Sequence, residues 1–238
     1  MRDGFPFDAV IFDMDGVIVD TELYYWRELR SFSEDLGLGV SAEELNDQVG
    51  ESNQVFRCNL VRWLERGGYG SLSPEEAERV YDRWAAGRPR DYASLLNPGV
   101  REALHGLSAR GVRLALASSS PTDNIREVLL ACGVEGAFEV VVSGADLAES
   151  KPNPEIYLRA LDELGLSAEA SCCIEDSVPG IAAGKRAGLT VLARREERFG
   201  FSQAEADYVI ERVDDVLFPE RWRRPESRAG KGPSADLI

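Results

Sequence analysis

Short runs of apolar, often β-branched residues recur along the chain, and segments with helical spacing separate them. Such runs are typical of strands buried on both faces of a sheet, and the helices between them indicate parallel strands joined by right-handed crossovers. The sequence therefore predicts an α/β fold with a parallel sheet. Its strands are expected at Ala9–Phe12, Val112–Ala117, Phe138–Val142, Ser171–Ile174, Leu189–Ala193 and Tyr208–Ile210.

The stretch between about residues 20 and 95 has a different pattern and contains no strand-like run. Its apolar residues recur every three or four positions, which is the spacing of amphipathic helices. Two helix starts are also visible as capping-box patterns, Ser41 with Glu44 and Ser73 with Glu76. We therefore expect a helical domain inserted after the first strand.

These patterns divide the chain into three parts. A core domain is predicted from residues 1–19 and 96–218, and the helical insertion occupies residues 20–95. Residues 219–238 are rich in Pro, Gly, Ser and Arg, so we expect a tail with little structure of its own.

Composition narrows the choice of partners. The chain has 238 residues and a formal net charge of −15, which argues against a nucleic-acid backbone or an anionic membrane as a partner. Asp8 and Asp13 interrupt the apolar start, so no signal peptide is expected, and no apolar run approaches the about 18 residues of a membrane span. We expect a cytoplasmic protein, monomer or weak dimer, that acts on a small molecule.

Polar residues that could carry chemistry follow four of the predicted strands. Because the carboxyl ends of parallel strands meet at one edge of the sheet, we expect these side chains to lie close together. Hydroxyl and backbone N–H groups at the helix start after the second strand would also bind an anion. In chain order the residues are Asp13 and Asp15, Ser118 and Ser119, Lys151, and Glu175 and Asp176.

The chemical types of these residues predict phosphoryl transfer. Asp13 and Asp176 offer the oxygen ligands that Mg²⁺ prefers, and the metal lets a carboxylate approach an anionic phosphate. Asp13 is the predicted nucleophile that forms an aspartyl-phosphate, and Asp15 is the predicted general acid and base. Ser118 would bind a phosphoryl oxygen, while Lys151 would neutralise charge and orient Asp13.

In this order the motifs resemble the haloacid dehalogenase superfamily, and most closely its β-phosphoglucomutase-like phosphatases. The resemblance covers about residues 7–217 and rests mainly on residues 12–17, 150–154 and 175–177. It implies a Rossmann-like core with an inserted α-helical cap domain.

The resemblance also implies how the cofactor Mg²⁺ would bind. The ligands would be the Asp13 side chain, the Asp15 backbone carbonyl and Asp176, with Glu175 close by. Dehalogenases of the superfamily lack a carboxylate at the position of Asp15, so its presence here favours phosphate-ester chemistry.

The cap is expected to select the substrate, through Gly50, Glu51, Ser52 and Asn53. Phosphosugar mutases of the family carry a Lys and an Arg in this region that bind a second phosphate, whereas this segment has no cation before Arg57. The predicted function is therefore hydrolysis of a small phosphorylated metabolite, such as a sugar phosphate. A β-phosphoglucomutase-type mutase is one alternative. The other is a non-enzymatic receiver-like signalling module, which the inserted cap disfavours because receivers need an open face for partners.

Overall fold

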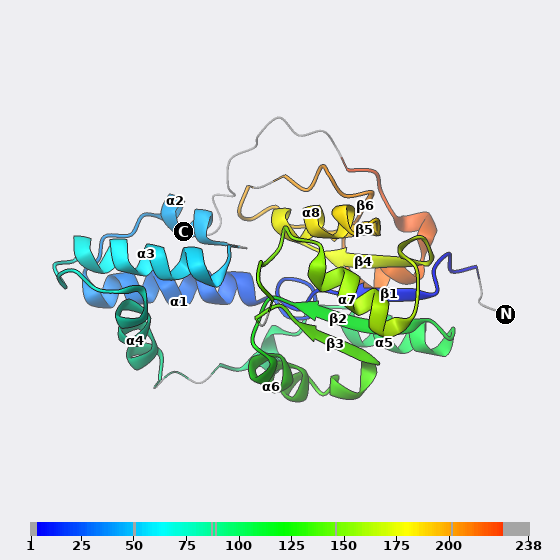
Figure 1. Ribbon diagram of the computed structural model, residues 1–238, viewed down its shortest axis with the longest axis horizontal. Helices are drawn as coiled ribbons and strands as arrows, with labels where there is room; N and C mark the ends of the chain where they lie inside the picture. Colours follow the sequence, from blue (N-terminus) through cyan, green and yellow to red (C-terminus); the bar gives the residue numbers. More distant parts are fainter. Residues whose placement is uncertain are drawn as a thin grey trace. The chain divides into compact units, whose positions relative to one another are not determined.

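The computed structural model describes residues 4–49, 51–86, 88, 90–145, 147–200 and 202–225, and it forms two compact units (Figure 1). One unit contains the chain up to Asp20 and from Tyr92 onward, and the other contains Thr21–Asp91. Across these described ranges, no helix is both long enough and apolar enough to cross a membrane.

The first unit is built on a six-stranded parallel sheet with the order β3-β2-β1-β4-β5-β6. The predicted α/β class is therefore what the structure shows. The strands are β1 (Ala9–Phe12), β2 (Arg113–Ser118), β3 (Val140–Ser143), β4 (Ser171–Glu175), β5 (Thr190–Arg194) and β6 (Tyr208–Ile210).

Four of the strands, β2 to β5, end one residue later than the apolar pattern predicted, and the added residues are polar. Ser118, Ser143, Glu175 and Arg194 still belong to the hydrogen-bonded ladder although they follow the apolar run. The pattern missed them because apolar runs report burial in the core, not backbone pairing. Polar side chains are thereby fixed on the rigid carboxyl edge of the sheet.

Helices cover both faces of this sheet (Figure 1). Side chains alternate along β1, so Val10 and Phe12 pack in one apolar cluster while Ala9 and Ile11 pack in the other. The first cluster includes residues of α5 (Val100–Ala109) and α6 (Thr122–Cys132). The second includes residues of α7 (Glu155–Leu164) and α8 (Val178–Arg186). Burial on both faces holds the strand ends, and hence the polar edge, in fixed positions.

The second unit is helical. It contains α1 (Thr21–Leu36), α2 (Ala42–Gln48), α3 (Asn53–Arg66) and α4 (Pro74–Ala85). Both predicted capping boxes are present, at the starts of α2 and α4. The boundary differs from the sequence-based one, because the short 3₁₀ helix η1 (Tyr92–Leu95) belongs to the first unit, where Tyr92 is buried and accepts a hydrogen bond from Asn124.

The expectation that structure is lost after residue 218 is wrong for the first residues of that segment. Pro219–Arg221 form a 3₁₀ helix, and the Trp222 ring packs against Phe5, Phe7 and Tyr208. Backbone hydrogen bonds in both directions also join Arg223 to Val209 of β6. One large apolar ring anchors a segment whose average composition looks disordered. Residues 226–238 of the predicted tail lie outside the described residues.

Candidate active site

Three acidic side chains meet at the carboxyl ends of β1 and β4. Asp13, Glu175 and Asp176 are buried, and one oxygen from each lies within 4.8 Å of the others. Asp13 directly follows β1, and its N–H donates to the Ile174 carbonyl at 3.0 Å, so pairing with β4 continues one residue beyond the strand. Strand register therefore places Asp13 beside Glu175, the last residue of β4, and Asp176, which follows it.

A single ammonium group is shared by two of these acids. Lys151 Nζ donates to Asp13 Oδ1 and to Glu175 Oε1, both at 2.6 Å, and to the Ala117 carbonyl at 3.2 Å. The Tyr157 hydroxyl of α7 donates to the same Glu175 oxygen. Burial alone would lower the pKa of Lys151, but the charges of Asp13 and Glu175 outweigh it and raise that pKa, so the ammonium stays charged.

Asp13 carries an electrostatic cost in this position. Burial, with the nearby charges of Glu175 and Asp15, raises the pKa of Asp13 to about 8, although Lys151 opposes the rise. Two buried carboxyl groups, Asp13 and Glu175, share the one ammonium of Lys151, so when both are ionised their charge exceeds what Lys151 balances. All the donors are hard oxygen atoms, which suits a small divalent cation such as Mg²⁺.

Hydrogen bonds from four protein donors hold Glu175. Glu175 receives hydrogen bonds from Lys151 and Tyr157 on one oxygen and from Ser177 Oγ and the Asp176 N–H on the other, at 3.3 and 3.2 Å. Glu175 is therefore oriented by four protein donors, and one of them, Lys151, also binds Asp13.

Two glycines allow the backbone to approach these carboxylates closely. Gly16 has a φ of +80°, and a Cβ atom there would lie 1.8 Å from Asp176 Oδ2. A Cβ at Gly180 would lie 2.0 Å from Glu175 Oε2. Both distances are far below van der Waals contact, so the position of each acid depends on the missing side chain beside it.

Asp15 is close enough for its charge to act on Asp13, but it is not one of the three acids whose oxygens gather within 4.8 Å. Its Oδ2 atom accepts a hydrogen bond from Ser120 Oγ at 3.1 Å, and the cluster described above does not include its side chain. Ser118 is fully buried and its hydroxyl accepts from the Ser120 N–H at 3.1 Å, while Ser119 is exposed. The sequence pointed to Ser118 and Ser119, whereas the serine in contact with Asp15 is Ser120.

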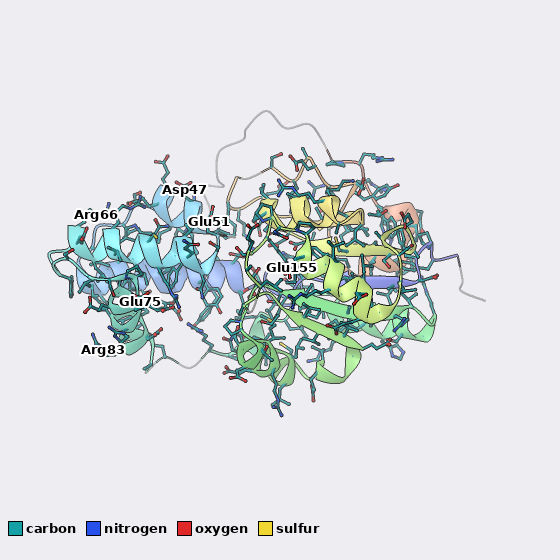
Figure 2. All side chains as sticks on the ribbon, viewed as in Figure 1. Asp47, Glu51, Arg66, Glu75, Arg83 and Glu155 are labelled. Atoms are coloured by element: carbon teal, nitrogen blue, oxygen red, sulfur yellow. The ribbon has the colours of Figure 1, made fainter. Side chains whose placement is uncertain are left out.

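The predicted cap residues belong to the second unit. Glu51 is exposed in the segment between α2 and α3 (Figure 2). Ser52 caps α3 by accepting from the Val55 N–H at 3.4 Å, and Asn53 is the first residue of that helix. Gly50 lies outside the described residues. A role of these residues in substrate recognition stays a prediction.

Sequence reasoning missed Tyr157. It is fully buried in α7, six residues after Lys151, where its hydroxyl donates to Glu175 and its ring centroid lies 5.3 Å from Lys151 Nζ. At helical spacing it looks like an ordinary core aromatic residue, so no signal in the sequence separated it from the apolar residues beside it.

Comparison with known proteins identifies the family. The family model of haloacid dehalogenase-like hydrolases matches residues 7–188. The "phosphorylated carbohydrates phosphatase" of Thermotoga maritima is 35% identical over 184 residues, which are 76% of this chain and 82% of that protein. "Hexitol phosphatase B" of Escherichia coli K12 is 34% identical over 185 residues, with 76% and 80% covered.

A solved structure shows the same fold. The β-phosphoglucomutase of Clostridium difficile superposes with a TM-score of 0.69, at 24% identity, over 90% of this chain and 95% of that one. The predicted resemblance, the fold class and the prediction of a phosphatase enzyme are all confirmed. The chain belongs to the haloacid dehalogenase-like hydrolase family, and the two sequence relatives named above are phosphatases of carbohydrate and hexitol type by name.

Proposed function

We propose that the protein is a Mg²⁺-dependent phosphatase that hydrolyses a sugar phosphate through an aspartyl-phosphate on Asp13. The observation that carries the proposal is the pairing of Asp13 with a buried ammonium at 2.6 Å, in a cluster with Asp176 and with Asp15 two residues away. The phosphatase relatives that act on phosphorylated carbohydrates and hexitols by name support the substrate class.

Asp13 and Asp176 would hold Mg²⁺, together with the Asp15 backbone carbonyl. When bound, the ion supplies the positive charge that a buried carboxylate needs beside an anionic phosphoryl group. Glu175 keeps Lys151 at the site through the 2.6 Å ion pair, and Lys151 in turn orients Asp13.

In the first step an Asp13 carboxylate oxygen attacks phosphorus, and the bond from phosphorus to the sugar oxygen breaks. Asp15 gives its proton to that leaving oxygen. In the second step Asp15 takes a proton from water, the water oxygen attacks the aspartyl-phosphate, and inorganic phosphate leaves with Asp13 regenerated. Ser118 and Ser119 would donate hydrogen bonds to the phosphoryl oxygens, and Lys151 would balance their charge.

The second unit favours hydrolysis over the mutase alternative. A mutase must hold two phosphates, and the first cation after Glu51 is Arg57, whose guanidinium pairs with Glu78 at 2.8 Å. An arginine engaged by a carboxylate is a poor site for a second phosphate.

The test is phosphate release from a panel of sugar and sugar-alcohol phosphates with Mg²⁺. Asp13→Asn and Asp15→Asn should abolish release, while Asp162→Asn, on the exposed side of α7, should leave it unchanged. No release by the wild-type protein from any ester, or undiminished release by Asp13→Asn, would refute the proposal. Conversion of β-glucose 1-phosphate to glucose 6-phosphate would establish the mutase instead.

A further inference from the structure

Three polar side chains outside the acid cluster hold the backbone around it. Arg194, the last residue of β5, donates from Nη1 to the Gly16 carbonyl at 2.8 Å and from Nη2 to Asn97 Oδ1 at 3.0 Å. Buried Asn97 donates in turn to the carbonyls of Gly16 and Val17, both at 3.0 Å. The Gly16 carbonyl is thus fixed by two different side chains.

Gln203 joins the same network from the segment that follows β5. Its Nε2 atom donates to the Asp176 carbonyl at 2.6 Å and to the Arg194 carbonyl at 2.7 Å. Its Oε1 atom accepts from the Glu196 N–H at 3.1 Å. All of these residues belong to the first unit, and together they tie the segments after β1, β4 and β5 to one another.

The network acts on the acid cluster through Gly16. The Gly16 backbone lies so close to Asp176 that a Cβ atom would overlap with the carboxylate, and Gly16 is also the neighbour of Asp15. A small shift of the Gly16 peptide would therefore change the space open to Asp176 and the direction of Asp15. Fixing that peptide fixes two groups that the proposed reaction uses.

We infer that Arg194 is a positioning residue: by holding the Gly16 carbonyl it sets the geometry of Asp176 toward a bound Mg²⁺ and of Asp15 toward the substrate. This inference rests on the proposed function: its metal-binding half needs the proposed Mg²⁺ site, and its catalytic half needs the proposed phosphatase reaction as well. Residues that orient metal ligands without contacting the metal typically contribute about 10- to 100-fold to metal affinity.

The chain provides a matched control in the next residue. Arg195 is also half-buried and also makes charged hydrogen bonds, to Glu211 at 2.7 Å and to Glu197 at 3.4 Å. Both of those acids are exposed partners in the first unit and neither is part of the acid cluster. Replacing Arg195 therefore removes a similar side chain without releasing Gly16.

The experiment compares Arg194→Met, Arg194→Lys, Gln203→Leu and Arg195→Met with the full-length wild-type protein. Isothermal titration calorimetry without substrate measures Mg²⁺ binding. Hydrolysis of p-nitrophenyl phosphate measures turnover, and thermal unfolding measures stability. Methionine keeps the apolar stem of Arg194 while removing its donors. If Arg194→Met does not fold, Arg194→Lys and Gln203→Leu still test the network.

We expect Arg194→Met to weaken Mg²⁺ binding about 10- to 100-fold and to lower kcat at saturating Mg²⁺ with KM within about twofold, since the substrate contacts remain. Arg194→Lys should recover part of both, Gln203→Leu should weaken Mg²⁺ binding several-fold, and Arg195→Met should match the wild type. Wild-type Mg²⁺ affinity in Arg194→Met, with only a lower melting temperature, would overturn the inference and leave Arg194 a structural residue.

The same data separate this inference from the proposed function. A wild-type protein that binds Mg²⁺ but hydrolyses no ester would refute the phosphatase, while loss of binding in Arg194→Met would still support the positioning of Asp176. Equal losses in Arg194→Met and Arg195→Met would contradict the inference even if the phosphatase is confirmed.

Discussion

Replacing Lys151 with methionine should strongly destabilise the metal-free protein. The lysine side chain is only 7% exposed, and its partners Asp13 and Glu175 are 9% and 0% exposed. Removing one partner of a buried ion pair costs about 3–5 kcal/mol, because the remaining charge is left in a poorly solvated place. Here one substitution removes the counter-ion of two carboxylates, while methionine still fills most of the space.

Proton uptake by Asp13 limits how much folding free energy the Lys151→Met variant loses. Its pKa is already raised to about 8 by burial with Lys151 present, and Lys151 is the group that opposes the rise. Without the lysine the carboxyl group stays neutral to a higher pH, so near neutrality the loss is expected at about 3 kcal/mol, the lower end of the range. The loss should grow as the pH rises and Asp13 is forced to ionise.

Lys185→Met is the matched control. Lys185 pairs with Asp207 at 2.6 Å, the same distance as in the Lys151 pairs, but the two side chains are 38% and 26% exposed. Exposed pairs contribute about 0–1 kcal/mol because water solvates the separated charges. Urea unfolding of both variants with a chelator present gives the two free-energy losses. Losses of equal size would refute the argument that burial decides the strength of the Lys151 pairs.

Three further outcomes are expected. In the metal-free protein the raised pKa of Asp13 makes the free energy of unfolding fall as the pH rises from about 4 through about 8. Mg²⁺ should therefore raise the melting temperature more at pH 8.5 than at pH 6, and an equal rise at both pH values would contradict this. The leaving group of p-nitrophenyl phosphate needs little protonation, so with this substrate Asp15→Asn should still form the aspartyl-phosphate but should accumulate it, because no base activates water. Mass spectrometry after quenching would detect the intermediate, and turnover without accumulation would show that Asp15 is not the base. Gly16→Ala should lose Mg²⁺ binding measured by calorimetry. In the control Gly111→Ala, where φ is +71° and no atom lies within 4 Å of the added carbon, only about 1 kcal/mol of stability should be lost. Equal effects of the two substitutions would point to backbone strain alone.

The gathering of distant polar residues could be predicted from the sequence because topology enforces it. Lys151 lies 138 residues after Asp13 and 24 residues before Glu175. The parallel strands nevertheless place all three at one edge of the sheet, where the structure finds them in contact. The segment around Trp222 shows the opposite case. Its local composition favours disorder, but packing against distant aromatic rings and backbone hydrogen bonds to β6 order it.

The groups that orient the site could not be predicted. Tyr157, Ser120 and Gln203 are ordinary residues in ordinary patterns. They join the site through hydrogen bonds that form only in the folded chain, to Glu175, Asp15 and the Asp176 carbonyl respectively. The hydrogen-bond partners of Glu175 could not be predicted for the same reason. Glu175 and Asp176 are adjacent in sequence, but only the fold shows that Glu175 is occupied by Lys151 and Tyr157.

The arrangement of charges explains why a stable fold would keep so costly a cluster. A core optimised for stability would not bury two carboxyl groups against one ammonium with a third acid beside them, since each excess negative charge opposes folding. A site that must bind a cation and then a phosphate needs that excess, because a fully neutralised pocket would give the cation no reason to bind. The rigid sheet edge, the Gly16 contact and the network of Arg194 and Gln203 hold the acids in place against their repulsion. The deficit of positive charge is therefore the feature that links the fold to the proposed reaction.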